Sequence, residues 1–486
     1  MASPISSNSF ANLGNLCKLL VALGVTIFFI FVISIPDQFY STRSAFEFFT
    51  VLVNKPLPSS TTLVHDEVSL NSDTNLSHLV FGLIGSEGAW HYRKNYIESW
   101  WRPTTTRGML YLDTDPTGDL LPWSVSSPPY RVSDNLTEFL QETRAVAPIM
   151  IRMVHGIMEL LRDVDNENVR WVVMGDDDSI FFVDNIVDVL AQYDHRKYYY
   201  LGGQSEFIMS NFWFSFNQGF GGAGFMLSYP LAKALANDMD DCLRSYALVN
   251  SADLITMLCI ADIGVNLSPQ KGIHQIDLHG DISGMLSSHW KFPIMSLHHF
   301  DMIDPIFPNM DRAESARHLM KAAEADQSRM VQQTICHERR NNWTISVSWG
   351  YSAHIYERII RRSHLQNPIE TFKPWIDVSR PPPLYMFNTR LPTGDPCEAP
   401  HVFFLHRVNK SSAGVLTVYS RAAPRGLDPC FWCGASCPDF VMEIHVHSPS
   451  TNRKQMDRCE CCDVVGVNGT TAEVKFRECR TDEIIA

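Results

Sequence analysis

Between residues 78 and 239, short apolar runs typical of strands alternate with segments that have the period of an amphipathic helix. The predicted strands are "HLVFGLIGS", "MLYLDTD", "VRWVVMG" and "YYYLGG". Apolar residues line one helical face from Val146 to Leu161, and further helices are predicted in "VDNIVDVLAQY" and "YPLAKALANDM". This alternation predicts an α/β fold, a mostly parallel sheet with helices on both faces.

Three consecutive aspartates, Asp176, Asp177 and Asp178, directly follow the predicted strand "VRWVVMG". In parallel sheets of this kind, ligands bind beyond the carboxyl ends of the strands. A divalent cation would offset the repulsion among the carboxylates, and Mg²⁺ or Mn²⁺ typically uses one or two carboxylates plus substrate phosphates. The triplet therefore predicts a metal site suited to a nucleotide-sugar diphosphate, or else a solvated acidic turn before the helix near Val183.

A glycine-rich turn, "NQGFGGAGFMLSYP", follows the aspartates, with Gly221 and Gly222 at its centre. Because glycine lets the backbone approach a ligand closely, the turn is either a binding loop or a packing turn. Asp253 begins an apolar helical run. Its carboxylate is either a helix cap or a general base that takes a proton from an acceptor hydroxyl.

Several histidines lie downstream and offer imidazoles that would complete a metal shell: His274, His298 and His299. The residue pattern does not choose among them. A polar helix is predicted over residues 311–338, followed by a β-rich segment in which "CFWCGASC" and "CECC" occur. These cysteines are spaced as zinc ligands would be, but an oxidising compartment favours disulfides of undetermined pairing.

The compartment is indicated by the N-terminus, where residues 19–35, "LLVALGVTIFFIFVISI", carry no charge and no proline. We interpret this run as an uncleaved signal anchor with a short cytoplasmic tail, which would place the rest of the chain in a lumen; a cleaved signal leads to the same compartment. Of the 12 cysteines, 11 follow the run. Glycosylation acceptor triplets begin at Asn75, Asn135, Asn266, Asn342, Asn409 and Asn468.

The net charge of -13 argues against nucleic acid as the main partner, although it leaves room for a local nucleotide site. The length of 486 residues suits one large domain and a smaller one.

The ordered pieces "HLVFGLIGS", "RKNYIESWW", "RWVVMGDDDSIFFVDNIVDVLAQYD", "GFGGAGFMLS", "SAD" and "GIHQ" together resemble the Fringe-like branch of the family-31 β-1,3-glycosyltransferases. The similarity is greatest to the plant Fringe-related proteins and spans roughly Leu79 to Pro308. It implies a GT-A fold and an inverting transfer from a UDP-sugar donor to a glycan or glycoprotein acceptor, assisted by Mn²⁺ or Mg²⁺, in the Golgi lumen.

The resemblance also implies roles for single residues. Asp178 would be the principal metal ligand, and Asp176 and Asp177 would contact the nucleotide ribose or metal-bound water. Arg93 and the turn at Gly221 and Gly222 would approach the donor, and Asp253 would be the catalytic base, although related enzymes have a second acid where this chain has Ala252. His274 matches a Fringe histidine, whereas His298 matches one of core-1-type transferases.

We therefore predict a single-pass type II Golgi membrane protein. Its expected parts are a cytoplasmic tail at 1–18, a transmembrane anchor at 19–35, a stem at 36–77, a GT-A domain at 78–340 and a Cys-rich, β-rich module at 341–486. Two other functions are compatible with these features. One is a catalytically silent lumenal protein that binds a glycan or a partner enzyme, and the other is a metal-dependent nucleotide hydrolase. The oligomeric state is not predicted.

Overall fold

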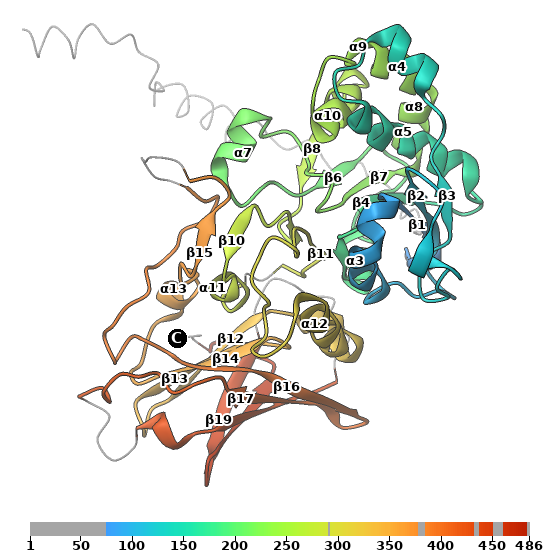
Figure 1. Ribbon diagram of the computed structural model, residues 1–486. Coiled ribbons are helices and arrows are strands. Elements are labelled where there is room, and N and C mark those ends of the chain that lie inside the picture. Colours follow the sequence, from blue (N-terminus) through green and yellow to red (C-terminus); the bar gives the residue numbers. More distant parts are fainter. Residues whose placement is uncertain (1–73, 290–291, 378–383, 432–436, 451–459, 484–486) are drawn as a thin grey trace, which may run out of the picture. The chain divides into compact units, whose positions relative to one another are not determined.

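A mixed seven-stranded sheet forms the first half of the described chain. The computed structural model describes residues 74–289, 292–377, 384–431, 437–450 and 460–483. In the order in which they lie in the sheet, the strands are β3 (Tyr130–Val132), β2 (Arg107–Leu112), β1 (Leu79–Ile84), β4 (Trp171–Asp176), β7 (Phe225–Ser228), β6 (Tyr200–Gly202) and β8 (Leu267–Pro269) (Figure 1). Neighbouring strands are parallel except at β7, which is antiparallel to β4 and β6. The predicted α/β fold with a parallel-rich sheet is confirmed.

Helices cover both faces of this sheet. They are α3 (Glu87–Glu98), α4 (Thr137–Thr143), α5 (Pro148–Asp163), α6 (Val183–Leu190), α8 (Tyr229–Asn237), α9 (Met239–Ser245), α10 (Ala252–Asp262) and α12 (Arg312–Asp326). A further helix, α7 (Ile208–Trp213), follows β6 in the chain. On one face, Val172 and Met174 of β4 belong to a core shared with α5, α8, α9 and α10. On the other face, Trp171 and Val173 belong to a core shared with α3, α6 and α12. Strand β4 is apolar on both faces for this reason.

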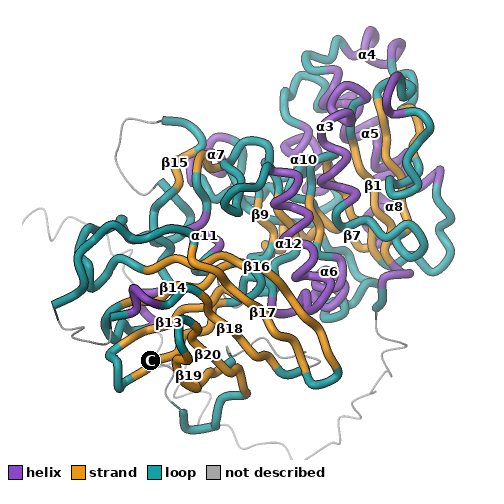
Figure 2. The backbone as a smooth tube through the Cα atoms, turned by 60° about the horizontal axis from the view of Figure 1, so that its bottom comes forward, coloured by secondary structure: helices purple, strands orange, loops and turns teal. Residues whose placement is uncertain are grey.

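A second sheet of eight strands forms the C-terminal part. In sheet order these are β12 (Gln333–Glu338), β13 (Trp343–Ser348), β14 (Ser352–Tyr356), β16 (His401–Ser411), β17 (Gly414–Arg421), β18 (Glu443–Ser448), β20 (Thr471–Arg477) and β19 (Cys461–Asn468) (Figure 2). The β-rich character predicted for this region is confirmed.

The helix predicted over residues 311–338 is too long. Helix α12 ends at Asp326, a short 3-10 turn follows at Gln327–Arg329, and residues from Gln333 form strand β12. The segment becomes a strand because β12 pairs in antiparallel fashion with β13 along its whole length. Sheet pairing thus overrides the local helical pattern.

The two sheets share one hydrophobic core. The side chains of Trp349 and Phe403 belong to the same apolar cluster as strand β1 and helix α12. Short strands add a second connection, because β10 (Leu278–Gly280) pairs with β15 (Phe372–Pro374) (Figure 1). The seven-stranded half and the C-terminal sheet therefore form one unit.

Disulfides are present in the described residues, as predicted. They join Cys242 to Cys259, Cys336 to Cys462, Cys397 to Cys430 and Cys461 to Cys479. Cysteines of both clustered motifs are thereby bonded to sulfur, so the alternative of zinc ligation is not supported at Cys430, Cys461 and Cys462.

The predicted anchor at 19–35 lies outside the described residues, together with the predicted tail and nearly all of the predicted stem. Within the ranges that are described, no helix combines the length and the apolar character that a membrane crossing requires.

Candidate functional site

The aspartate triplet lies at the carboxyl end of β4, as the alternation of strands and helices predicts. Asp176 is the last residue of β4, and its N–H donates to Ser179 Oγ at 2.8 Å. The Ser179 hydroxyl in turn donates to the carbonyl of Gly222 at 2.6 Å. This pair of bonds fixes the aspartate turn against the glycine turn.

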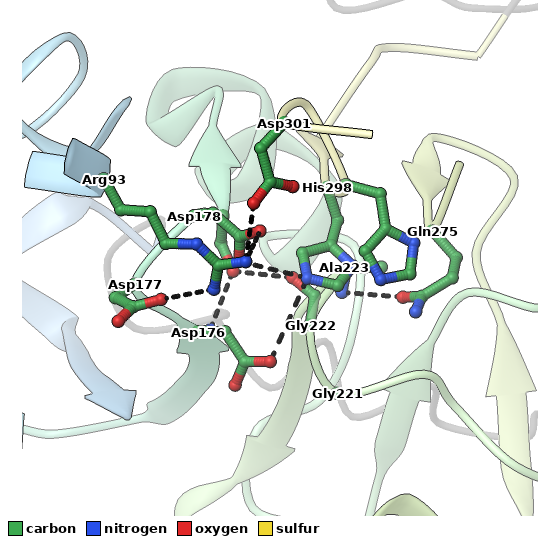
Figure 3. A network of polar contacts seen from close by, with 12 residues as sticks. Arg93, Asp176, Asp177, Asp178, Gly221, Gly222, Ala223, Gln275, His298 and Asp301 are labelled. Atoms are coloured by element: carbon green, nitrogen blue, oxygen red, sulfur yellow. Dashed lines mark hydrogen bonds and ion pairs between the residues drawn. The ribbon is translucent and has the colours of Figure 1, made fainter. Parts of the chain in front are cut away.

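Arg93, from α3, contacts three acidic side chains at once (Figure 3). Its Nη1 donates to Asp177 Oδ1 at 2.8 Å, while Nη2 donates to Asp301 Oδ2 at 2.7 Å and lies 3.3 Å from Asp178 Oδ2. The second oxygen of Asp177 accepts from the N–H of Ser86 at 3.2 Å. Asp177 is therefore held by α3 and its N-terminal cap, away from the imidazole that faces Asp178.

His298 is the histidine that the structure brings to the triplet. Its Nε2 lies 3.1 Å from Asp178 Oδ1 and 3.9 Å from Asp176 Oδ2. The potential ligand atoms of Asp176, Asp178 and His298 all lie within 4.8 Å of one another. These three side chains form a compact group, which we call the acidic site.

The charges around the acidic site do not balance. Four carboxylates, those of Asp176, Asp177, Asp178 and Asp301, face one guanidinium and one imidazole. Burial and the neighbouring Asp178 charge raise the pKa of Asp176 well above its ordinary value. Burial alone would raise the pKa of Asp178 too, but the charges of His298 and Arg93 lower it to about 2.

The acidic site fits a divalent cation. Neither buried carboxylate oxygen of Asp178 has a hydrogen bond of good geometry, although His298 Nε2 lies 3.1 Å from one and Arg93 Nη2 lies 3.3 Å from the other, so both oxygens keep capacity for a further cation. Two carboxylates and one imidazole are a suitable ligand set for Mn²⁺, and Mg²⁺ also accepts the carboxylates. The excess of negative charge favours the same ligand.

The glycine turn contacts the candidate ligand and the candidate base. A Cβ atom at Gly222 would collide with the imidazole ring of His298, and one at Gly221 would collide with the carboxylate of Asp253. The N–H of Gly221 donates to Asp253 Oδ1 at 2.9 Å. Glycine is needed here because both side chains approach the backbone closely.

Asp253 is not the N-cap of α10. That position belongs to Ser251, whose Oγ accepts from the N–H of Leu254, while Ala252 is buried in the apolar core beside α5. Burial raises the pKa of Asp253 to about 6, and its hydrogen bond from Gly221 limits the increase. Asp176 and Asp253 line the same small cavity. This carboxylate is therefore free to serve the site instead of the helix end.

His274 lies outside the acidic site, although the sequence left it as an equal candidate. Its Nδ1 is 2.9 Å from Glu206 Oε1, and its Nε2 is 2.8 Å from Nε2 of His289. Only its backbone approaches the site, because the His274 carbonyl accepts from the N–H of His298 at 3.1 Å. His274 and His298 are thus neighbours through a backbone hydrogen bond, but their side chains have different partners.

The sequence reasoning missed Asp301, Gln275 and Trp375. Asp301 follows His298 by three residues in "LHHFD", and Gln275 ends the motif "GIHQ" and accepts from the N–H of Ala223 at 3.0 Å. Asp301 and Gln275 could have been found from their positions within those motifs. Trp375 comes from the distant strand β15 region and had no signal.

Trp375 stacks between two imidazoles. Its ring centroid lies 4.5 Å from that of His299 and 4.7 Å from that of His279, with nearly parallel planes. His299 has a positive φ of 50° and follows the candidate ligand His298 directly. The C-terminal segment thereby packs against the backbone that carries His298.

Together, the parallel-rich sheet, the acidic site beyond β4 and the nearby Asp253 define a mixed α/β protein, consistent with a GT-A type of architecture, that has a candidate metal site. The chain belongs to the family described as "Protein of unknown function, DUF604", which it matches over residues 210–462, more than half of its length. Residues 137–282 match the "Fringe-like" family. The chain is therefore a Fringe-related glycosyltransferase family member. A search of curated proteins found no match.

Proposed function

We propose that the protein transfers a sugar from a UDP-sugar to a hydroxyl of a glycan or glycoprotein, with inversion and with a β-1,3 linkage. The observation that carries the proposal is the pairing of the acidic site with Asp253 across the glycine turn. The Fringe-like match supports a glycosyltransferase of this kind and spans both the aspartates and Asp253.

The residues that would hold the cation are Asp176, Asp178 and His298. A bound Mn²⁺ or Mg²⁺ supplies positive charge that stabilises the leaving diphosphate. Gly222 leaves room for the His298 ring, and Arg93 keeps Asp177 and Asp301 in place around the site.

Asp253 is suited to the proton transfer. The acceptor oxygen forms a bond to the anomeric carbon while the bond from that carbon to the UDP oxygen breaks, and the hydroxyl proton passes to the Asp253 carboxylate. Its raised pKa, about 6, makes it a stronger base than an ordinary aspartate while leaving it ionised at neutral pH. Attack from the face opposite UDP inverts the anomeric configuration.

The proposed location is the Golgi membrane, with the anchor at 19–35 and the described residues in the lumen. The disulfides support this location, because such bonds persist in oxidising compartments.

The test is product analysis. The purified full-length chain is incubated with a panel of UDP-sugars and Mn²⁺, with and without a glycoprotein acceptor mixture. Sugar incorporation that requires both acceptor and metal would support the proposal. Release of UDP and free sugar at the same rate with and without acceptor would replace it with nucleotide-sugar hydrolysis, and a folded protein that neither binds nor consumes any donor would replace it with a silent binding protein.

A further inference from the structure

A large cavity lies beside the acidic site and has no role in the account above. Its volume is about 530 Å³, within the range of about 300–1,000 Å³ that is usual for small-molecule sites. One wall comes from the residues that follow β6 and from β9 (Ile273–His274). The opposite wall comes from two stretches of the C-terminal half, Gln366–Pro368 and Met386–Asn388.

The cavity adjoins the proposed catalytic residues through shared backbone. Strand β9 pairs in parallel with β11 (Ser296–Leu297), which leads directly into His298. The residue after β9, Gln275, accepts from the N–H of Ala223 in the glycine turn. A ligand in the cavity would therefore rest against the elements that position both the acidic site and Asp253.

The side chains around the cavity suit a neutral, hydroxyl-rich ligand. Amides line it from both walls, Gln204 on one side and Asn367 and Asn388 on the other, and each offers donors and acceptors together. The rings of Phe292 and Phe387 add flat apolar surface. Paired amides and aromatic rings match the vicinal hydroxyls and the apolar face of a sugar.

The charged groups of the cavity already have partners within the protein. Glu206 is buried, contacts His274 at 2.9 Å and accepts from the N–H of Ile276 at 2.7 Å. The ammonium of Lys271 lies 4.8 Å from the centre of the Phe292 ring. Lys271 is exposed, so its charge lies on the solvent side of the lining, whereas the buried Glu206 is held by groups of the protein.

The C-terminal wall separates this chain from the Fringe-like pattern. The Fringe-like match ends at residue 282, before either stretch of that wall, whereas the match over residues 210–462 contains both stretches. The wall is held in place by backbone pairing, since Met386 N–H donates to the Glu206 carbonyl at 2.9 Å and Ile208 N–H donates to the Leu384 carbonyl at 3.0 Å. The cavity is therefore completed by a part of this chain that lies outside the Fringe-like match.

We propose that this cavity binds a saccharide unit of the acceptor, so that the C-terminal half selects which glycan receives the sugar. The inference rests on the proposed transferase function, because a transferase needs an acceptor site beside its donor site.

The test uses the purified full-length chain and a panel of methyl glycosides of hexoses, N-acetylhexosamines, deoxyhexoses and pentoses. Binding is measured by saturation-transfer NMR and titration, beside UDP binding in Mn²⁺. The variant Asn388→Trp places a large ring at the exposed mouth of the cavity. The matched control is Asn237→Trp, at the exposed last residue of α8 and away from the cavity lining.

We expect at least one glycoside to bind wild type and the control alike. Its dissociation constant should rise about tenfold or more in Asn388→Trp, because the added ring occupies its space, while UDP binding stays unchanged. Glycoside binding that Asn388→Trp leaves intact would overturn the inference, and so would a wild-type protein that binds UDP but none of the glycosides. A wild-type protein that does not bind UDP would instead refute the proposed function. Failure of the inference and failure of the proposed function are thus distinguished.

Discussion

The protein contains two buried clusters of acidic and basic side chains, which differ in how completely their charges are compensated. In the C-terminal sheet, Glu357 is fully buried, yet both of its oxygens have partners. One oxygen contacts His401 at 2.7 Å and also Arg425, and the other accepts from the N–H of Cys430 at 2.6 Å. At the acidic site, Asp178 is equally buried, but its oxygens have only ion-pair contacts, with His298 at 3.1 Å and Arg93 at 3.3 Å, and no hydrogen bond.

We interpret the Glu357 cluster as one that stabilises the fold and the acidic site as one that binds a ligand. Glu357 has neutralising partners inside the protein, and its removal would take the ion-pair partner from Arg425 and leave His401 only the more distant Asp439, at 3.8 Å. The acidic site has more negative than positive groups, so the fold leaves part of its charge uncompensated. Both groups contain enough potential ligands for a metal, which shows that ligand count alone does not identify a metal site.

Replacement of the proposed base should have the largest effect. We expect Asp253→Asn to lower the rate of transfer by about 10²- to 10⁴-fold, because the amide cannot take the acceptor proton. UDP binding, measured by calorimetry, should persist. Unchanged transfer in a variant that still binds UDP would remove Asp253 from this role.

Stability measurements test the difference between the Glu357 cluster and the acidic site directly. We expect Glu357→Gln to lower the free energy of unfolding by about 3–5 kcal/mol, since it removes the carboxylate from a buried charge cluster. Asp176→Asn, without added metal, should keep or increase stability, because the raised pKa of Asp176 shows that its charge is disfavoured in the fold.

Urea denaturation followed by fluorescence would measure both variants, with Glu473→Gln as the control for a partly exposed ion pair. That control should change stability by about 1 kcal/mol or less. If Asp176→Asn proved as destabilising as Glu357→Gln, the two clusters would not differ in kind.

A smaller effect should come from Trp375, which acts on the acidic site only through its neighbours. We expect Trp375→Ala to weaken Mn²⁺ binding by about 10-fold, because outer residues of metal sites typically contribute about 10- to 100-fold. Trp375→Phe should restore most of the affinity, since a ring still stacks on His299. Equal losses in both variants, by metal titration, would argue against stacking as the cause.

The pH dependence should be the mildest test. The proposed base acts only when ionised, and the pKa of Asp253 is raised to about 6. Transfer should therefore increase about tenfold per pH unit below pH 6 and level off above it. Initial rates at saturating donor would show this limb, which should be absent from the residual activity of Asp253→Asn.

Local patterns predicted the first half of the fold well. The strands around Phe81 and Val173 and the helix around Val154 follow from apolar periodicity, and the place of the aspartates follows from the geometry of parallel sheets. The glycine turn was also found, but its function as a seat for His298 and Asp253 depends on contacts across the chain.

The rest depended on pairings between distant segments. The residues of strand β12 were predicted as helix, because their extended conformation depends on pairing with β13, which the local pattern does not show. His274 and His298 have similar sequence surroundings, and only the pairing of β9 with β11 shows which imidazole faces Asp178. Trp375 is distant from the histidine motifs in the sequence, yet its ring stacks on that of His299.

The most direct test of the central claim is a calorimetric titration of UDP into the full-length protein. It is made with Mn²⁺ and with a chelator, and repeated with Asp178→Ala. We predict binding that requires both the metal and Asp178, because the excess negative charge of the acidic site is compensated only by the cation. Equal UDP binding in the chelator, or in folded Asp178→Ala, would contradict the account and leave the aspartates a structural turn.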